Sequence, residues 1–308
     1  MVGASSEGAL KLQTARAIGA VVARFVHTEE VGGSKPPSPT DAPHESQSAA
    51  RRRGMSAPAI VLVARGDDDP AVRASLDVVI DHLHRLRPDL RVALGLLNSS
   101  TPTVHEAVAS LAASGVEEIA MVPMDLVSAT DHSPVLSHAR DEVGAANPDL
   151  SIVIARPIGP DIDLLNVLDA KLRDALHRAN AVEVDALVLA CPDGGDHRGN
   201  SLLARRARQW GAHHKLPVQL AQNDISGRAT GLAIGALRGQ GRRHIAVGSL
   251  FLTSGPVFRA HQQVAIRAGA LAVTPPITED PRVTELILAR YAFAAMRLLD
   301  IDPHEDGT

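Results

Sequence analysis

From residue 59 onward, short runs of apolar, often β-branched residues alternate with longer stretches in which apolar residues recur at a helical period. In the first half of the chain, the short runs predict strands at 59–64, 91–96, 117–123 and 151–155. The longer stretches predict helices at Asp69–Leu86, Thr103–Ser114, Ser133–Ala146 and Asp163–Ala179. Each helix begins near a Ser, Thr or Asp that can cap its free amides. This alternation is typical of a parallel sheet covered by helices on both faces.

The second half of the chain repeats the first at an offset of about 126 residues. The run VLVA at Val61 matches LVLA at Leu187, and GVEEIAMVPMDLVSA from Gly115 matches GRRHIAVGSLFLTSG from Gly241 without a gap. Later in each half, ARPIGPD matches TPPITED at a slightly smaller offset. Several matches that share one offset indicate internal duplication. We therefore predict an α/β fold of two lobes, each with a four-stranded parallel sheet, related by a pseudo-twofold axis.

The first 54 residues do not follow this pattern. Residues 8–26 have a helical period, and the Pro-, Ser- and Gly-rich stretch after them has none, which predicts one short helix and a disordered linker. An upstream start without a function explains the same residues equally well. We divide the chain into an N-terminal extension (1–54), a first repeat (55–182) and a second repeat (183–308).

The composition narrows the class of protein. Apolar residues make up 45% of the chain, enough for two cores, and the net charge of -4 provides no basic field for nucleic acid. A single cysteine, Cys191, cannot form an internal disulfide, and no apolar run reaches the roughly 18 residues of a membrane span. We therefore expect a cytoplasmic protein without a nucleic-acid or membrane partner. Aromatic residues are only 2% of the chain, so a flat ligand would lie between aliphatic walls.

Ligands of open parallel sheets bind beyond the carboxyl ends of the strands. Two similar lobes are therefore expected to hold their ligand where these ends face one another. In the first half the segments at the strand ends are Arg65–Asp69, Leu97–Thr101, Met124–His132 and Arg156–Asp161. In the second half they are Cys191–Arg198, Gln222–Ile225, Leu250–Phe258 and Pro275–Asp280.

Several of these segments resemble the sirohydrochlorin and cobalt chelatases, the class II chelatase family that shares its fold with ferrochelatase. IVLVARGDDDP resembles the family's opening strand, IAMVPMDLVSATDH its strand followed by a loop ending in Gly-His, and IARPIGPD its closing strand. LAVTPPITEDPRVTELILARYAFA resembles the C-terminal half of the long, two-repeat actinobacterial members. The resemblance implies two ferrochelatase-like lobes and the insertion of Co²⁺ or Fe²⁺ into a tetrapyrrole in sirohaem or cobalamin synthesis. The metal is then a substrate, and no organic cofactor is implied.

The resemblance also assigns site residues. In the family, a histidine after the first strand, a glutamate after the second and a histidine after the third bind metal and accept pyrrole protons; here the matching residues are Arg65, Asn98 and His132. His132 is the predicted catalytic residue and metal ligand. Arg65 has no lone pair for a metal and is predicted to bind a substrate carboxylate, with Asn98 and Ser128 as further substrate contacts. Asp67 is the predicted second metal ligand.

Two alternatives remain. Because two of the three family positions are substituted, a descendant that binds a tetrapyrrole or metal without chelation fits the same residues. A nucleotide binder is less favoured, because CPDGGDHRGN matches neither glycine-rich phosphate pattern. We expect a small tetrapyrrole as partner, and monomer and homodimer both stay open. Cys191 is predicted to pack in a core, and His213 and His214 are predicted to face solvent.

Overall fold

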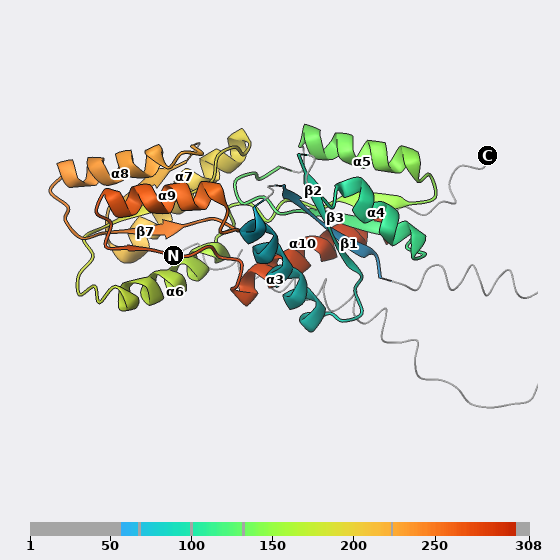
Figure 1. Ribbon diagram of the computed structural model, residues 1–308, viewed down its shortest axis with the longest axis horizontal. Coiled ribbons are helices and arrows are strands. Elements are labelled where there is room, and N and C mark those ends of the chain that lie inside the picture. The colour runs from blue at the N-terminus through green and yellow to red at the C-terminus, as the bar shows by residue number, and fades with distance from the viewer. Residues whose placement is uncertain (1–56, 67–68, 99–100, 131–132, 223, 300–308) are drawn as a thin grey trace, which may run out of the picture.

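The computed structural model describes residues 57–66, 69–98, 101–130, 133–222 and 224–299. The N-terminal extension 1–54 lies outside them. Two four-stranded parallel sheets lie side by side along the long axis of the molecule (Figure 1). The first has the order β2-β1-β3-β4 and the second the order β6-β5-β7-β8. The equal orders confirm the predicted two-lobe α/β fold.

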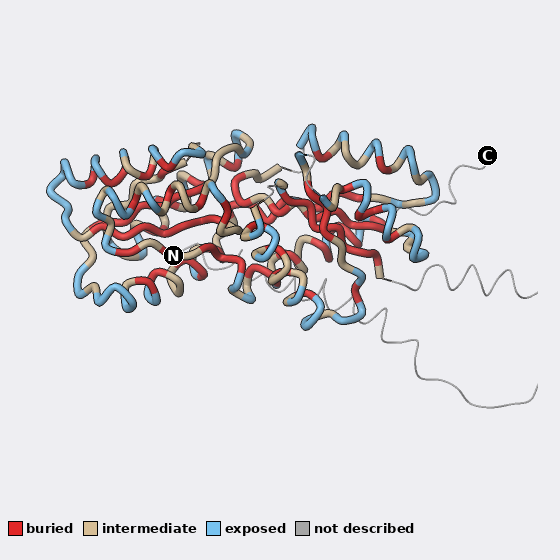
Figure 2. The backbone as a smooth tube through the Cα atoms, in the orientation of Figure 1, coloured by how far each residue is buried: buried red, intermediate tan, exposed pale blue. Residues whose placement is uncertain are grey.

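The strand boundaries agree with the predicted ones to within one residue in the first half. The first sheet consists of β1 (Ala59–Arg65), β2 (Val92–Leu97), β3 (Glu118–Pro123) and β4 (Ser151–Ile154). The second consists of β5 (Ala186–Ala190), β6 (Val218–Ala221), β7 (Ile245–Ser249) and β8 (Ala272–Val273). The central strands are almost wholly buried, as Figure 2 shows, because helices cover both faces of each sheet.

Helices follow the strands in alternation. They are α3 (Pro70–Leu86), α4 (Val104–Ala113), α5 (Pro134–Ala146), α6 (Asp163–Arg178), α7 (His197–His214), α8 (Arg228–Gly239), α9 (Pro256–Arg267) and α10 (Pro281–Leu299). Asp69, Thr103 and Ser133 cap α3, α4 and α5 as the sequence predicts. α6 differs: its N-cap residue Ile162 makes no side-chain hydrogen bond, and the Asp161 carboxylate accepts from the Asp163 amide instead.

The last helix of each half covers the sheet of the other half. α6 packs on β7 and β8, and α10 packs on β3, β4 and α3 (Figure 1). The docking of α10 includes a buried hydrogen bond of 2.8 Å from the Tyr291 hydroxyl to the carbonyl of Pro58, just before β1. Each lobe thus contains a helix from the other half of the sequence. The division into 55–182 and 183–308 stays a prediction about the sequence repeats.

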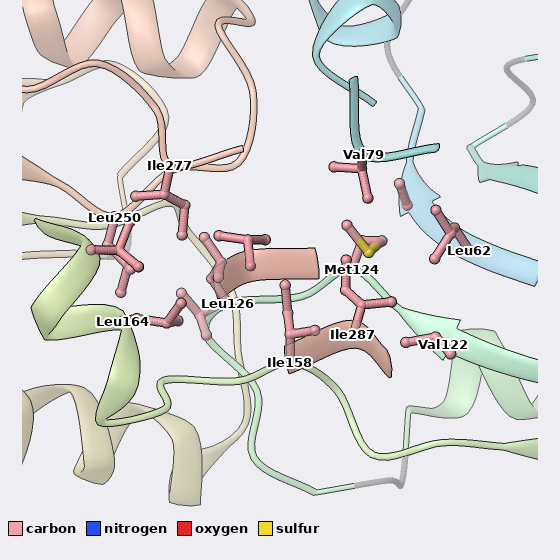
Figure 3. Packing of buried hydrophobic residues seen from close by; sticks show 14 of the residues in the cluster. Leu62, Val79, Val122, Met124, Leu126, Ile158, Leu164, Leu250, Ile277 and Ile287 are labelled. Atoms are coloured by element: carbon pink, nitrogen blue, oxygen red, sulfur yellow. The ribbon is translucent and has the colours of Figure 1, made fainter. Parts of the chain in front are cut away.

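One hydrophobic cluster extends through both lobes. Figure 3 shows it passing from Leu62 of β1, through Ile287 of α10 and Leu126, to Leu164 of α6 and Leu250 of the second lobe. Two further clusters each lie within one lobe, on the faces covered by α4 and α5 and by α8 and α9. The two lobes therefore share part of their core. None of the helices in the described ranges is long and apolar enough to cross a membrane.

Candidate functional site

Arg65 and Asn98 lie at the same edge of the first sheet. Arg65 is the last residue of β1 and pairs in register with Leu97, the last residue of β2. Beyond them, the Gly66 amide donates a 3.1 Å hydrogen bond to the carbonyl of Leu97, so the two strand ends stay together. Asn98 has a φ of 63°, a left-handed conformation that asparagine tolerates better than most residues. Both side chains are exposed, as expected for a ligand-facing edge.

The Arg65 guanidinium reaches the second lobe. Its Nη1 lies 3.5 Å from Oδ1 of Asp193, which follows β5, and a Cβ on Gly194 would lie 2.8 Å from its Nη2. The carboxyl ends of β1 and β5 therefore face one another, as the repeat predicts. The Arg65 side chain is 66% exposed, and a long ion pair between exposed groups contributes only about 0 to 1 kcal/mol. Asp193 can thus be exchanged for another carboxylate at little cost.

Asp196, the N-cap of α7, joins the second lobe to the loop before α5. Its Oδ1 accepts from the Gly199 amide at 2.6 Å, and its Oδ2 accepts from the Ala129 amide and from the amide and hydroxyl of Thr130 at 2.8 to 2.9 Å. Desolvation works against the charged carboxylate, but these hydrogen bonds outweigh it and lower the pKa of Asp196 to about 2. Asp196 is therefore a charged structural contact between the lobes.

Asp69 of the first lobe makes a corresponding contact with the second lobe. It caps α3 through a 2.8 Å hydrogen bond from the Ala71 amide, and its other oxygen pairs with Arg259 of α9. The hydrogen bond from Arg259 is the main cause that holds the pKa of Asp69 below its usual value. Of the three aspartates after β1, Asp69 is thus engaged in the junction, while Asp67 and Asp68 lie outside the described residues.

Known proteins are similar in sequence to part of this chain. Residues 59–175 match the CbiX family model. The sirohydrochlorin cobaltochelatase of Methanosarcina acetivorans is 27% identical over 124 residues, which are 38% of this chain and 95% of that protein. That of Priestia megaterium is 23% identical over 150 residues, which are 48% of this chain and 49% of that protein.

Residues 59–175 are thus similar to the CbiX family, and the relatives named here are sirohydrochlorin cobaltochelatases. The fold likeness extends further than the sequence likeness. The sirohydrochlorin chelatase SirB from Bacillus subtilis, solved in complex with cobalt, matches 80% of this chain and 98% of its own with a TM-score of 0.62 at 15% identity. The chelatase fold thus includes the second lobe, whereas the family model matches residues 59–175 alone.

The structure does not test the predicted metal ligands. His132 and Asp67 lie outside the described residues, so their roles remain predictions. Ser128, the third predicted substrate contact, is half-buried, and its hydroxyl donates a 2.6 Å hydrogen bond to Asp125. The Asp125 carboxylate also accepts from the amides of Val127 and Ser128. Ser128 therefore orders its own loop, and its contact with substrate stays a prediction.

Two arginines that the chelatase resemblance did not single out contact the loop after β4. Arg206 of α7 donates to the carbonyl of Pro160 at 2.9 Å. Arg290 of α10 donates to Asp161 at 2.8 Å and to the carbonyl of Pro157 at 3.1 Å. Both come from the second half of the sequence, so no local motif indicates their partners. They fix the loop between β4 and α6 at the junction of the lobes.

Two further expectations have clear outcomes. Cys191 is fully buried at the end of β5, and burial raises the pKa of its thiol, so it packs in the core as predicted. The prediction that His213 and His214 both face solvent is wrong for one of them. His213 is 69% exposed, but His214 is 27% exposed and its Nε2 lies 2.7 Å from Asp169 of α6. The helix exchange, which brings α6 against the second lobe, explains this contact.

Proposed function

We propose that the protein binds a sirohydrochlorin-type tetrapyrrole where the carboxyl ends of β1 and β5 face one another, and inserts a divalent metal, Co²⁺ or Fe²⁺, into it. The observation that carries the proposal is the Arg65 guanidinium, which is exposed at this junction and weakly paired with Asp193 at 3.5 Å. A planar guanidinium binds carboxylates through paired hydrogen bonds, and a carboxylate on the tetrapyrrole rim can replace Asp193. The family match over residues 59–175 and the cobaltochelatase relatives support the same substrate.

The metal is a substrate in this proposal. His132 is proposed to bind it and to accept a pyrrole proton, since imidazole has both a suitable lone pair and a suitable pKa. Asp67 is proposed as the second ligand, and Asn98 and Ser128 as contacts to the macrocycle. No organic cofactor is needed, because metal insertion exchanges two pyrrole protons for one divalent ion. The proposed location is the cytoplasm.

A second candidate is binding without chelation. The observation that favours it is the exposed pair Arg65 and Asn98 at the ends of β1 and β2, where the family resemblance implies a histidine and a glutamate. Arg65 keeps its positive charge at any working pH and repels a cation, and the Asn98 amide is no base. With these residues we expect insertion to be slow and tetrapyrrole binding to be retained.

An anaerobic titration separates the two candidates. Sirohydrochlorin is added to the full chain and binding is followed by its absorbance and fluorescence; Co²⁺ is then added to the same cuvette. Insertion faster than in a protein-free control supports the chelatase. Binding without such acceleration supports the non-chelating binder, and the absence of any tetrapyrrole binding contradicts both.

A further inference from the structure

Three side chains of types that can ligate a metal converge between α6 and α7, away from the carboxyl ends of the strands. They are Asp169, in the middle of α6, and His213 and His214, in the last turn of α7. Nε2 of His214 lies 2.7 Å from Oδ1 of Asp169, and Nε2 of His213 lies 3.6 Å from Oδ2. One ligand atom from each residue lies within 4.8 Å of the other two. The cluster is about 25 Å along α7 from His197, which begins that helix beyond β5.

A buried tryptophan orients the carboxylate of this cluster. Trp210 is fully buried, and its Nε1 donates a 2.6 Å hydrogen bond to Oδ1 of Asp169. Because Oδ1 already accepts from Trp210, Oδ2 is the oxygen directed to His213. Carboxylates that ligate metals are held by hydrogen bonds of this kind, which fix the free oxygen toward the ion. The Asp169 side chain is only 18% exposed, so its orientation does not depend on solvent.

We propose that Asp169, His213 and His214 form a binding site for a divalent transition-metal ion such as Zn²⁺ or Co²⁺. Two imidazoles and one carboxylate suit borderline ions of this kind, whereas Mg²⁺ and Ca²⁺ prefer oxygen ligands alone. Ligands at about 2.1 Å from a tetrahedral ion lie about 3.4 Å apart, close to the 3.6 Å between Asp169 and His213. When the ion binds, Nε2 of His214 ligates it in place of its present contact with Oδ1 of Asp169. The proton of the neutral imidazole then lies on Nδ1.

The site is separate from the proposed chelatase site. It shares no residue with the junction around Arg65, and it lies on the helices of the second lobe, toward the amino ends of the strands. If Asp169 only connected Trp210 and His214 by hydrogen bonds, that role would not explain why the exposed His213 also lies near its carboxylate. That difference makes His213 the residue on which to test the proposal.

The test uses the full chain and its only tryptophan, Trp210, whose ring centroid lies 5.7 Å from that of His214. Co²⁺ alone is titrated and the quenching of Trp210 fluorescence is recorded, with Zn²⁺ as a competitor that does not quench. Saturable quenching that Zn²⁺ reverses is expected. His213→Gln should raise the Kd for Co²⁺ at least tenfold. Even the loss of a residue that only hydrogen-bonds to a metal ligand lowers metal affinity about 10- to 100-fold. His177→Gln, an exposed histidine elsewhere on α6, is the matched control and should bind as the unchanged protein does.

Asp169→Asn gives a second readout that does not depend on His213. The amide oxygen can still accept from Trp210, so folding is retained, but the charged ligand is lost and the Kd should rise as well. Quenching that does not saturate, or equal Kd values in the unchanged protein, His213→Gln and Asp169→Asn, would overturn the proposal. Sirohydrochlorin binding should be unchanged by His213→Gln, so a failure here and a failure of the proposed function are distinguishable.

Discussion

Asp69 and Asp196 occupy equivalent positions in the two lobes. Each carboxylate caps the helix that follows the first strand of its lobe, and each also contacts a residue of the other lobe: Arg259 in one case and Thr130 in the other. The junction is therefore built from two helix caps that face in opposite directions, as a pseudo-twofold arrangement requires. The same two segments flank the place where the proposed substrate lies.

Replacing Asp196 with alanine should destabilise the protein by about 1 to 3 kcal/mol. The change removes a helix cap, typically worth about 1 kcal/mol, and leaves the amides of Ala129 and Thr130 without their acceptor. Urea unfolding measures the loss. Asp149→Ala, at an exposed aspartate, is the control and should unfold at the same urea concentration as the unchanged protein. Equal midpoints for both variants would show that the junction does not depend on Asp196.

The contribution of Asp196 also depends on pH in a predictable direction. Its pKa falls from 3.8 to about 2 on folding, so the charged carboxylate stabilises the native state fully above pH 4. That stabilisation is lost as the pH falls from about 4 to about 2. The difference in unfolding free energy between the unchanged protein and Asp196→Asn should therefore shrink over this range. A difference that stays constant would contradict the assignment.

Gly199 of α7 has no room for a side chain. A Cβ there would lie 2.8 Å from the carbonyl carbon of Val127 and 2.9 Å from the Cα of Ser128, both backbone atoms of the first lobe. Gly199→Ala should therefore cost about 1 to 3 kcal/mol, the usual range for overpacking. Gly144→Ala, on α5 with nothing within 4 Å of the added Cβ, should be neutral or stabilising. Thermal unfolding of the two variants checks the contrast.

The ionisation of Tyr291 can be used to test whether α10 is docked on the first lobe. It is the only tyrosine, and burial raises the pKa of its phenol, which donates to the carbonyl of Pro58. The absorbance of ionised tyrosine should therefore not develop near pH 10 while the protein is folded. Because the folded pKa is raised, the stabilisation is complete below pH 10 and falls at higher pH. A native protein whose tyrosine titrates near pH 10 would show that α10 is not docked.

Replacing Arg65 and Asn98 with the residues that the family resemblance implies should increase the rate of metal insertion. Arg65→His with Asn98→Glu adds an imidazole and a carboxylate to His132, a set suited to Co²⁺ and to proton transfer. We expect cobalt insertion to increase and to be lost again with His132→Ala. Arg73→His, at an exposed arginine on α3, is the control for the added imidazole.

Arg65→Ala alone should weaken sirohydrochlorin binding, measured by the fluorescence of the tetrapyrrole. Brisk insertion by the unchanged protein that survives His132→Ala would place the active site in the second half, around Asp193 and His197. Unchanged binding by Arg65→Ala would show that Arg65 does not contact the substrate.

The sequence predicts most of the local structure because local physics determines it. The first-half strands are found to within a residue, since β-branched runs between polar segments have few alternative structures. Asp69, Thr103 and Ser133 cap their helices as predicted, because a cap needs only residues two or three positions apart. The placement of Arg65 and Asn98 at one edge also follows, since parallel strands end together.

The contacts between distant segments could not be predicted in the same way. The amphipathic pattern of α6 and α10 shows that each buries one face, but it does not say against which sheet. The exchange of these helices brings Asp169 next to His214, and no spacing in the sequence indicates such a pair. The pairing of Arg65 with Asp193 likewise depends on the distance between two lobes, which only the folded chain defines.

The exchange of α6 and α10 has a consequence for the shorter relatives of this chain. The match to the Methanosarcina acetivorans chelatase, 124 residues long, is 95% of that protein, so such a chain has room for one repeat. If its last helix crosses over as α6 and α10 do here, one copy leaves a face of its sheet bare, and a second copy has to cover it. Fusing two copies then turns an assembly that depends on concentration into a single molecule. After fusion the two halves can differ in sequence, because each half packs against the other half and no longer against an identical copy.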